Sequence, residues 1–269
     1  MQSTEPVSGD VLPEEPREIA ERASAVGEQR LDRSSLDILV TAFIGGAEVA
    51  LGSLAAMTVM GAAMEAVPGL GLYPALALGG LVFPIGFLFV IVGRSELFTE
   101  NFLIPVVSVF QGERTVGSLG QLWVLSWVGN VVGCGGMAVL LAAPDVLAEP
   151  IRAAFGAYTD YKLSVPLNGT FLSAVLAGGV MTALTWLLLA IQHPVARIIA
   201  IAAGGYVLFA ANLSHSIVST SVMLAGFVEA HRGFNEVVVW QIVATAGNLV
   251  GGLGLVTLFR LTQAEQQES

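Results

Sequence analysis

Six long apolar stretches dominate this sequence, and they constrain its fold more than any other feature. They run at about 36–64, 73–110, 116–143, 167–192, 195–230 and 236–261. A helix needs about 20 mostly apolar residues to cross the hydrocarbon core of a bilayer. Only 12% of the residues are charged, against about 25% in soluble domains. The sequence therefore predicts an all-α integral membrane protein with six transmembrane helices.

The second and fifth stretches are too long for one unbroken span, and both contain polar residues. "IVGRSELFTENFLIP" occupies 91–105 and "ANLSHSIVSTS" occupies 211–221. Backbone that is not helical is tolerated at membrane depth only where it is buried in protein or lines a watery cavity. We therefore expect two half-helices joined by a break in each of these spans, with Pro84 and Pro105 flanking the first break.

Two glycine-rich segments repeat at a constant spacing. "WVGNVVGCGG" at 127–136 and "TAGNLVGGLG" at 245–254 align with an offset of 118 residues, which places Asn130 on Asn248. The G-N-x-x-G pattern is also typical of plain helix packing in membranes, so the glycines alone leave both interpretations open. The two asparagines are expected to bond exposed backbone groups at the breaks.

The same offset carries the first break, 96–100, onto 214–218. Each half then has three spans with a broken middle one, and an odd number of spans forces the halves into opposite orientations. The predicted architecture is an inverted repeat of three plus three spans with broken second and fifth helices. In such repeats the interrupted segments mark the binding site near the midplane.

Charge distribution predicts the orientation and the flanking segments. Nine of the 21 acids lie at positions 5–37, so residues 1–34 are interpreted as an acidic cytoplasmic tail, helical over 14–34. Residues 35–262 are expected to form the transmembrane domain, with halves at about 35–143 and 167–262. Residues 263–269 are expected to form a C-terminal tail. One side carries most of the cationic residues, namely Arg30, Arg33, Arg114, Arg197 and Arg260, against Arg152, Lys162 and Arg232 on the other. The richer side should be cytoplasmic, which puts both termini inside the cell, in a multi-pass protein of the inner (plasma) membrane.

Four charged residues are predicted at membrane depth: Glu48, Arg94, Glu96 and Glu100. Each costs roughly 2.5–3.5 kcal/mol on insertion scales if it is left unpaired. We expect Arg94 to pair with Glu48 or Glu96 and so to pin the first break. The alternative is that Arg94 attracts anions on the cytoplasmic side.

Several motifs together resemble one known family. "SELFTEN" at 95–101 resembles the L-F-T loop signature of the formate/nitrite transporters, and "NLSHSIVST" at 212–220 resembles their E-H-S-I segment. Both G-N motifs fit as well. The resemblance covers about 35–262 and is strongest to the YfdC-like branch of the family.

The resemblance implies an aquaporin-like protomer of six helices and a homopentamer in which each protomer has its own pore. Such pores pass small monovalent anions or their conjugate acids, such as formate, nitrite, lactate-like monocarboxylates or hydrosulfide, together with protons, and need no cofactor. Carried over by position, Leu97 and Phe98 match the cytoplasmic constriction, and Thr99 matches the loop threonine near the central histidine, His215. Lys162 lies 24 residues before Trp186, as the family's vestibule lysine does before its fourth-span tryptophan. Ser214 and Gly178 depart from the family's usual glutamate and asparagine.

The predicted chemistry centres on His215, whose side chain has an unperturbed pKa near neutrality. A neutral imidazole in a dry pore donates a hydrogen bond to, or exchanges a proton with, a weak acid in transit. The alternative is a structural histidine bonded to the first break. Phe209, like Leu97 and Phe98, is a candidate hydrophobic gate, because narrow apolar rings stop hydrated ions by dewetting; for Phe209 plain packing is the alternative.

Three other functions compete with anion transport. A neutral-solute pore of the aquaporin type and a non-transporting scaffold or sensor derived from the family both remain open. An intramembrane enzyme is disfavoured, because His215 with Ser216 or Ser219 is the only conceivable nucleophile–base pair. The single cysteine, Cys134, excludes a cysteine-rich metal site. No basic patch suggests nucleic-acid binding.

Overall fold

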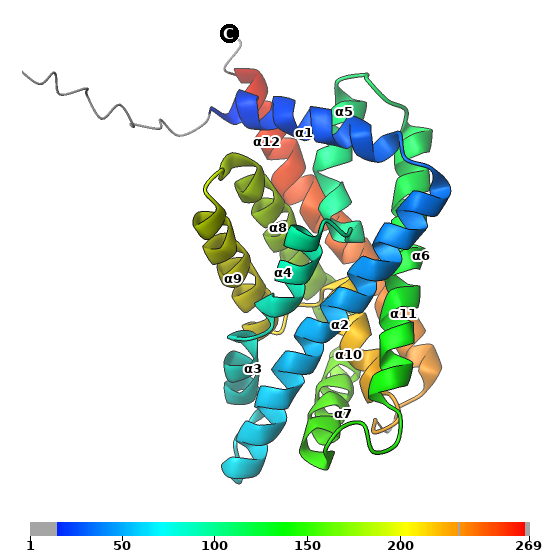
Figure 1. Ribbon diagram of the computed structural model, residues 1–269, viewed down its shortest axis with the longest axis vertical. Helices are drawn as coiled ribbons and strands as arrows, with labels where there is room; N and C mark the ends of the chain where they lie inside the picture. The colour runs from blue at the N-terminus through cyan, green and yellow to red at the C-terminus, as the bar shows by residue number, and fades with distance from the viewer. Residues whose placement is uncertain (1–14, 231, 267–269) are drawn as a thin grey trace, which may run out of the picture.

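The computed structural model describes residues 15–230 and 232–266. This part of the chain consists of helices joined by short connections, and it contains no strand (Figure 1). The elements in chain order are α1 (Pro16–Leu31), α2 (Ser35–Ala66), α3 (Leu72–Gly80), α4 (Pro84–Gly93), η1 (Phe98–Phe102), α5 (Ile104–Phe110), α6 (Val116–Leu141), α7 (Glu149–Ser164), α8 (Leu167–Ala190), α9 (Pro194–Ala210), α10 (Ser216–Gly226), α11 (Phe234–Val250), η2 (Gly251–Thr257) and α12 (Leu258–Glu265).

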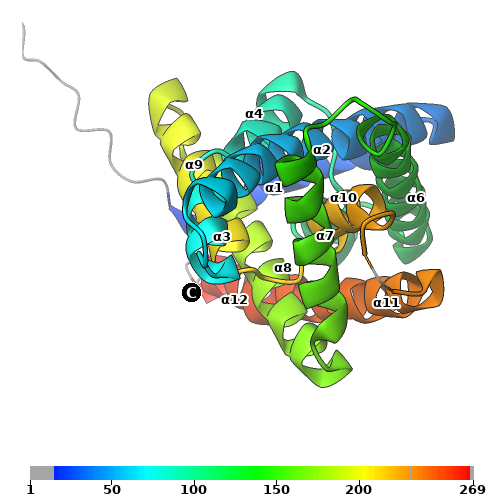
Figure 2. The same ribbon diagram turned by 90° about the horizontal axis from the view of Figure 1, so that it is seen from below.

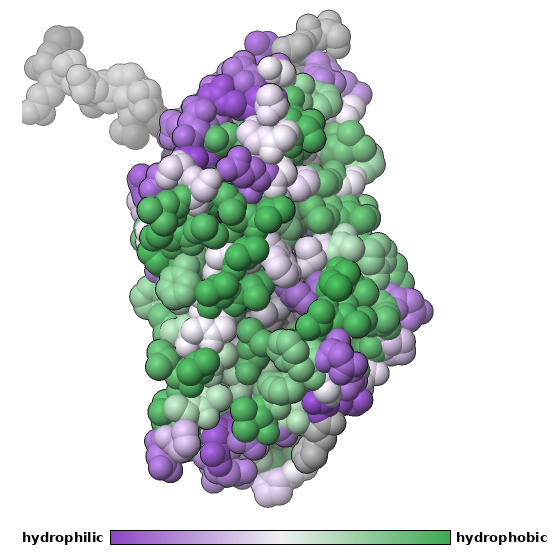
Figure 3. Space-filling view, turned by 90° about the vertical axis from the view of Figure 1, so that its right-hand side faces the viewer, coloured by the Kyte–Doolittle hydropathy of each residue, from purple (hydrophilic) through white to green (hydrophobic). Residues whose placement is uncertain are grey.

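The predicted membrane fold is confirmed. Within the described ranges, five helical stretches are long and apolar enough to cross a bilayer: Ser35–Ala66, Leu72–Gly93, Val116–Leu141, Leu167–Ala190 and Phe234–Glu265. The predicted fifth span is divided into α9 and α10, as expected for a broken helix. Figure 3 shows hydrophobic residues over most of the middle of one face and hydrophilic residues gathered mainly at its two ends.

The two halves pack in the same way. α2 packs against α6 in the first half, and α8 packs against α11 in the second. A Cβ atom at Gly46 of α2 would lie 2.1 Å from the carbonyl oxygen of Asn130, and one at Gly178 of α8 would lie 2.1 Å from that of Asn248. The backbones therefore touch at matching points. This explains Gly178, because no asparagine side chain fits there.

Helix α1 packs on the body of the protein rather than extending into solvent. Its buried face contains Ile19, Ala20 and Ala23, and it contacts α5 and α12 (Figure 1). The helix predicted over 14–34 is therefore observed at Pro16–Leu31, whereas residues 1–14 lie outside the described part. We call the end of the molecule that carries α1, α5 and α12 the α1 end.

Helix α7 lies at the opposite end, which we call the α7 end. It lies between the two predicted halves of the chain. Seen from below, α7 and α10 lie inside a ring of longer helices (Figure 2), and α7 contacts both α2 and α10. Its buried face contains Phe155, Tyr158 and Lys162. One face of α7 therefore belongs to the protein interior.

Candidate functional site

The two breaks in the second and fifth spans begin with the same backbone geometry. Arg94 follows α4 and Asn212 follows α9, and both adopt left-handed conformations, with φ of 61° and 52°. The amide of the next residue, Ser95 or Leu213, then bonds to a carbonyl five residues earlier, at 3.0 Å in each case. The equivalent positions at the offset of 118 thus end each half-helix in the same way.

Asn130 of α6 satisfies the backbone of the first break. Its Oδ1 accepts a hydrogen bond from the amide of Phe98 at 2.7 Å. Its Nδ2 donates to the carbonyls of Ala42, at 2.7 Å, and Glu96, at 2.8 Å. One buried side chain therefore replaces hydrogen bonds that an unbroken helix would have made, which is the predicted capping role.

Asn248 of α11 does the same for the second break. Its Oδ1 accepts from the amide of Ser216 at 2.8 Å. Its Nδ2 donates to the carbonyls of Ala174, at 2.8 Å, and Ser214, at 3.0 Å. The three partners match those of Asn130 atom by atom. Ser214 takes part in this contact through its carbonyl oxygen, so the contact does not depend on its side chain.

Thr99 and His215 join the two breaks. The Oγ1 of Thr99 lies 2.9 Å from the Nε2 of His215, and both residues are fully buried. The Nδ1 of His215 accepts a hydrogen bond from the amide of Val218 at 3.1 Å, which also caps α10. Because Nδ1 is an acceptor, the neutral ring carries its proton on Nε2 and donates it to Thr99.

Several aromatic rings lie in η1 of the first break and at the end of α9, next to the second break. Leu97, Phe98 and Phe209 are buried in one apolar cluster. The rings of Phe98 and Phe102 meet edge to face, with their centroids 4.9 Å apart. Phe209 stacks on Phe83 at 4.7 Å and on Tyr158 at 6.1 Å.

Lys162 brings a buried cation to the second break. Its Nζ donates to the carbonyls of Asn212, at 2.7 Å, and Leu213, at 3.1 Å, and it lies 5.4 Å from the centroid of the Tyr158 ring. No carboxylate among the described residues pairs with it. The side-chain amide of Asn212 and the hydroxyl of Ser216 are buried without a hydrogen-bond partner in the described part. Sequence reasoning did not single out Asn212 for a role here; its place three residues before His215 was the available signal.

The predicted ion pair between Arg94 and Glu48 or Glu96 is wrong. Glu48 instead accepts a hydrogen bond from the hydroxyl of Ser95, and Glu96 pairs with Arg33. The physical reason is the connection between α1 and α2, which brings Arg33 over the first break, where it reaches Glu96. The side chain of Arg94 forms no ion pair or hydrogen bond with any described residue, whereas its backbone amide donates to the carbonyl of Val90.

The other acid of the first break is also held from α1. Arg30 donates to Glu100 at 3.2 Å and to the Oδ1 of Asn101 at 2.7 Å, while Asn101 donates to Glu96. Sequence reasoning used Arg30 and Arg33 only to orient the chain. The available signal was their spacing of three residues directly before the first span, opposite two acids that need cations.

The described residues contain no group of three or more His, Cys, Asp or Glu side chains placed to hold a metal ion. His215 bonds Thr99 and Val218 rather than a serine hydroxyl, and Ser219 bonds the hydroxyl of Tyr158 at 3.1 Å. The nucleophile–base pair considered from the sequence is therefore not formed.

The sequence and the fold resemble those of known proteins. The sequence pattern of the formate/nitrite transporter family matches residues 17–262. The chain belongs to this family. It is 34% identical over 173 residues to a probable formate transporter of Methanothermobacter thermautotrophicus, an alignment that covers 64% of this chain and 61% of the relative.

Other relatives of the family align over more of their length. Inner membrane protein YfdC of Escherichia coli is 26% identical, over 98% of this chain and 83% of YfdC. The formate channel BtFdhC of Bacillus thuringiensis is 27% identical, over 94% of this chain and 97% of BtFdhC. Solved structures share the fold. One, described as an FNT family ion channel, has a TM-score of 0.80 at 19% identity. The alignment covers 91% of this chain and 98% of the chain in that structure. Another, described as a pentameric formate channel with formate bound, has a TM-score of 0.70 at 17% identity. The alignment covers 85% of this chain and 96% of the chain in that structure. This chain is therefore a multi-pass membrane protein of a transporter family.

Proposed function

We propose that each protomer forms a pore for small monovalent anions or their conjugate acids, such as formate or nitrite, and that His215 assists their passage. The observation that carries the proposal is the buried hydrogen bond of 2.9 Å between Thr99 and His215, which links the two breaks. A polar pair that joins two interrupted helices inside an apolar cluster is the arrangement expected of a midplane binding site.

The chemistry follows from the cost of desolvation. An anion alone in a dry apolar passage is very unfavourable, whereas its neutral acid crosses at much lower cost. The cationic Nζ of Lys162 attracts the anion to the second break, where the unpartnered amide of Asn212 offers hydrogen-bond donors. The anion takes up a proton from solvent at the mouth. The Nε2–H of His215 then donates a hydrogen bond to an oxygen of the passing molecule in place of Thr99.

Apolar side chains provide the selectivity against hydrated ions. Leu97 and Phe98 are the narrow apolar element on the α1 side of the pair, and Phe209 is the matching element on the other side. All three are buried in the apolar cluster that also contains Phe102. Hydrated ions do not wet such constrictions, whereas a small neutral acid passes them.

The assembly and orientation also belong to the proposal. We assign a homopentamer in the inner (plasma) membrane with both termini cytoplasmic, residues 1–34 and 263–269 flanking the channel domain. The related proteins described as an inner membrane protein and as a pentameric channel support this assignment. The arginines of α1 and α12 at the α1 end favour a cytoplasmic location for that end.

Flux through proteoliposomes tests the proposal. Formate, nitrite, hydrosulfide and the neutral solute glycerol are offered in turn to wild type, His215→Ala and His215→Asn. We expect anion flux in wild type and a reduction of about tenfold or more in both variants, because loss of a buried hydrogen-bond donor costs roughly 1.5–3 kcal/mol. Glycerol flux without anion flux would instead indicate an aquaporin-like pore. An absence of all flux in a folded wild type would indicate a scaffold or sensor.

A further inference from the structure

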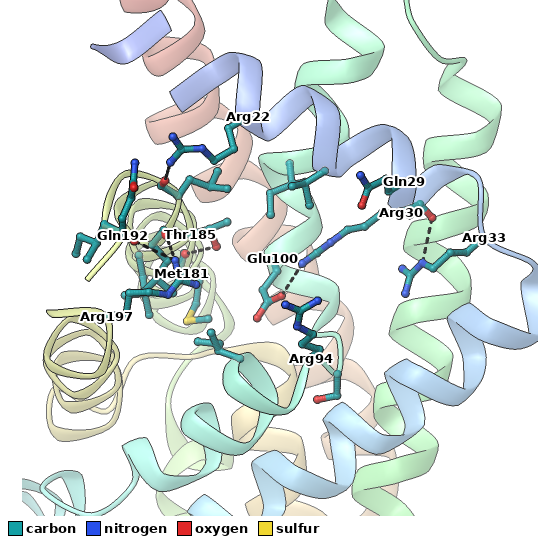
Figure 4. A pocket seen from close by; sticks show the side chains of 18 residues that line it. Arg22, Gln29, Arg30, Arg33, Arg94, Glu100, Met181, Thr185, Gln192 and Arg197 are labelled. Carbon is teal, nitrogen blue, oxygen red and sulfur yellow. Dashed lines mark hydrogen bonds and ion pairs between the residues drawn. The ribbon is translucent and has the colours of Figure 1, made fainter. Parts of the chain in front are cut away.

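A large basic cavity lies at the α1 end, outside the Thr99–His215 pair. Its volume is about 830 Å³, and α1, α4, α8 and the first break contribute to its lining. Glu100 is the one carboxylate among its lining residues. Five arginines also line it: Arg22, Arg30, Arg33, Arg94 and Arg197. Figure 4 shows these side chains around the cavity, with Arg94 and Glu100 near its centre.

Part of this positive charge is neutralised. Arg30 pairs with Glu100, and Arg33 pairs with Glu96 from behind the lining. Arg197 has only neutral partners: it donates to the carbonyl of Leu188, and to that of Ile191 at 3.1 Å. These carbonyls belong to the end of α8 and the residue that follows it. Arg94 and Arg197 therefore have no carboxylate partner among the described residues.

Arg94 is the cation with most capacity to bind a ligand. It is exposed and lines the cavity, and its side chain has no hydrogen bond or ion pair with a described residue. Its left-handed backbone, with φ of 61°, is a conformation that favours glycine over a residue with a side chain. An arginine in that conformation, with its planar fork of five donors unused, is suited to grip an oxyanion in a bidentate manner.

We infer that this cavity binds a multivalent phosphate-bearing anion, held by Arg94 and the guanidinium groups around it. A volume of about 830 Å³ lies within the range of pockets that enclose whole small-molecule ligands, whereas formate has three heavy atoms. Two guanidinium groups without a carboxylate partner, those of Arg94 and Arg197, match a polyanion better than a single charge. Guanidinium groups bind phosphate oxygens in the same geometry that they use for carboxylates.

The occupant would lie directly beside the first break. Glu100 lines the cavity and belongs to η1, the same short helix that carries Phe98 and Thr99. A bound polyanion competes with Glu100 for Arg30, and so acts on the segment that carries the constriction. This consequence for flux rests on the proposed function, whereas binding itself does not.

Calorimetry on the full chain tests binding directly. Wild type, Arg94→Gly and Arg260→Gln are placed in nanodiscs of the zwitterionic lipid phosphatidylcholine and titrated with pyrophosphate and with chloride. Arg94→Gly removes the guanidinium and suits the left-handed backbone, so its fold should persist. Arg260→Gln removes an arginine at the same end, outside the cavity. A phosphatidylglycerol arm distinguishes a lipid headgroup from a soluble phosphate.

We expect pyrophosphate to bind wild type. The dissociation constant of pyrophosphate should rise about tenfold or more in Arg94→Gly, but less than twofold in Arg260→Gln. If a lipid phosphate is the natural ligand, phosphatidylglycerol will also weaken pyrophosphate binding, again only where Arg94 is present. Absence of pyrophosphate binding in neutral nanodiscs, binding unaffected by Arg94→Gly, or chloride binding as tightly as pyrophosphate would each overturn the inference. None of these outcomes depends on whether formate passes the pore.

Discussion

Asn130 and Asn248 stabilise the broken helices in the membrane, because each satisfies three backbone groups with one side chain. A buried amide or carbonyl left without a partner costs roughly 1–3 kcal/mol. The two asparagines also lock the geometry on which the contact between Thr99 and His215 depends. At the scale of single residues, the site is therefore built by two amides before any transport chemistry is considered.

Replacing either asparagine should destabilise the protein strongly. We expect Asn248→Ala to lower the free energy of unfolding by about 3 kcal/mol or more, because three backbone groups lose their partner. This corresponds to a thermal midpoint lower by about 6 °C or more, measured by thermal unfolding in detergent. Asn168→Ala, at an exposed position of α8, is the control and should change stability by less than about 0.5 kcal/mol. Equal midpoints for both variants would contradict the capping role.

Residue-scale prediction succeeded where a local rule applied and failed where the tertiary fold decided. The capping by Asn130 and Asn248 could be predicted, because broken helices need partners and the repeat supplied them. The partner of Glu96 could not be predicted, because Arg33 lies 63 positions away. Arg33 reaches Glu96 only because the connection between α1 and α2 brings it over the first break. The unpartnered amide of Asn212 likewise became visible only in the structure.

At the scale of elements, α1 is fastened to the first break. Arg30 and Arg33, near its C-terminal end, hold Glu100 and Glu96. Glu96 is almost completely buried, with 3% of its side chain exposed, so water cannot solvate its carboxylate if the arginine is removed. The N-terminal helix therefore supports the segment that carries Leu97, Phe98 and Thr99.

A double-mutant cycle measures this attachment. Arg33→Met should destabilise the protein by about 3–5 kcal/mol, because it leaves a buried carboxylate without its cation. Combining it with Glu96→Gln removes the charge that was left unpaired, so the double variant should recover much of the loss. Thermal unfolding of the two single variants and the double variant gives the coupling energy. Additive effects would show that the two residues do not interact.

The close approach of α8 and α11 gives a second prediction at this scale. A Cβ atom at Gly178 would lie 2.1 Å from the carbonyl oxygen of Asn248, whereas one at Gly120 of α6 meets nothing within 4 Å. Gly178→Ala should therefore cost about 1–3 kcal/mol or more through overpacking. Gly120→Ala should be neutral or stabilise by about 0.5–1 kcal/mol, since alanine favours a helix. Similar thermal midpoints for the two variants would argue against the packed interface.

The elements themselves were largely predictable. Span lengths, the two breaks and the offset of 118 between Asn130 and Asn248 are encoded in the pattern of apolar and small residues. The exception is α7. It lies between the two predicted halves, and only its packing against α2 and α10 reveals that Tyr158 and Lys162 face inward.

At the scale of the whole molecule, hydrophilic residues gather mainly at the two ends, while the middle of the face shown is mostly hydrophobic (Figure 3). Large side chains remain exposed on α6, α8 and α11, for example Val124 at 62%, Leu172 at 64% and Ile242 at 64%. Such surfaces suit contact with lipid or with neighbouring protomers. The inverted repeat and the arginine-rich α1 end together define an axis across the membrane.

Cysteine labelling tests the direction of this axis. Cys134 is buried, so it gives little background. Val146→Cys, exposed at the α7 end, should react with a membrane-impermeant maleimide in intact cells, while Gln111→Cys, exposed at the α1 end, should react only after lysis. The reverse pattern would place the termini outside.

The central claim is that a small acid crosses with its proton past the imidazole of His215. The most direct measurement records internal pH in proteoliposomes while an inward formate gradient is applied. Wild type should acidify the interior faster than protein-free liposomes. His215→Asn, in which an asparagine can still cap α10, should acidify at the protein-free rate. Equal acidification by wild type and His215→Asn, with both proteins folded, would contradict the account.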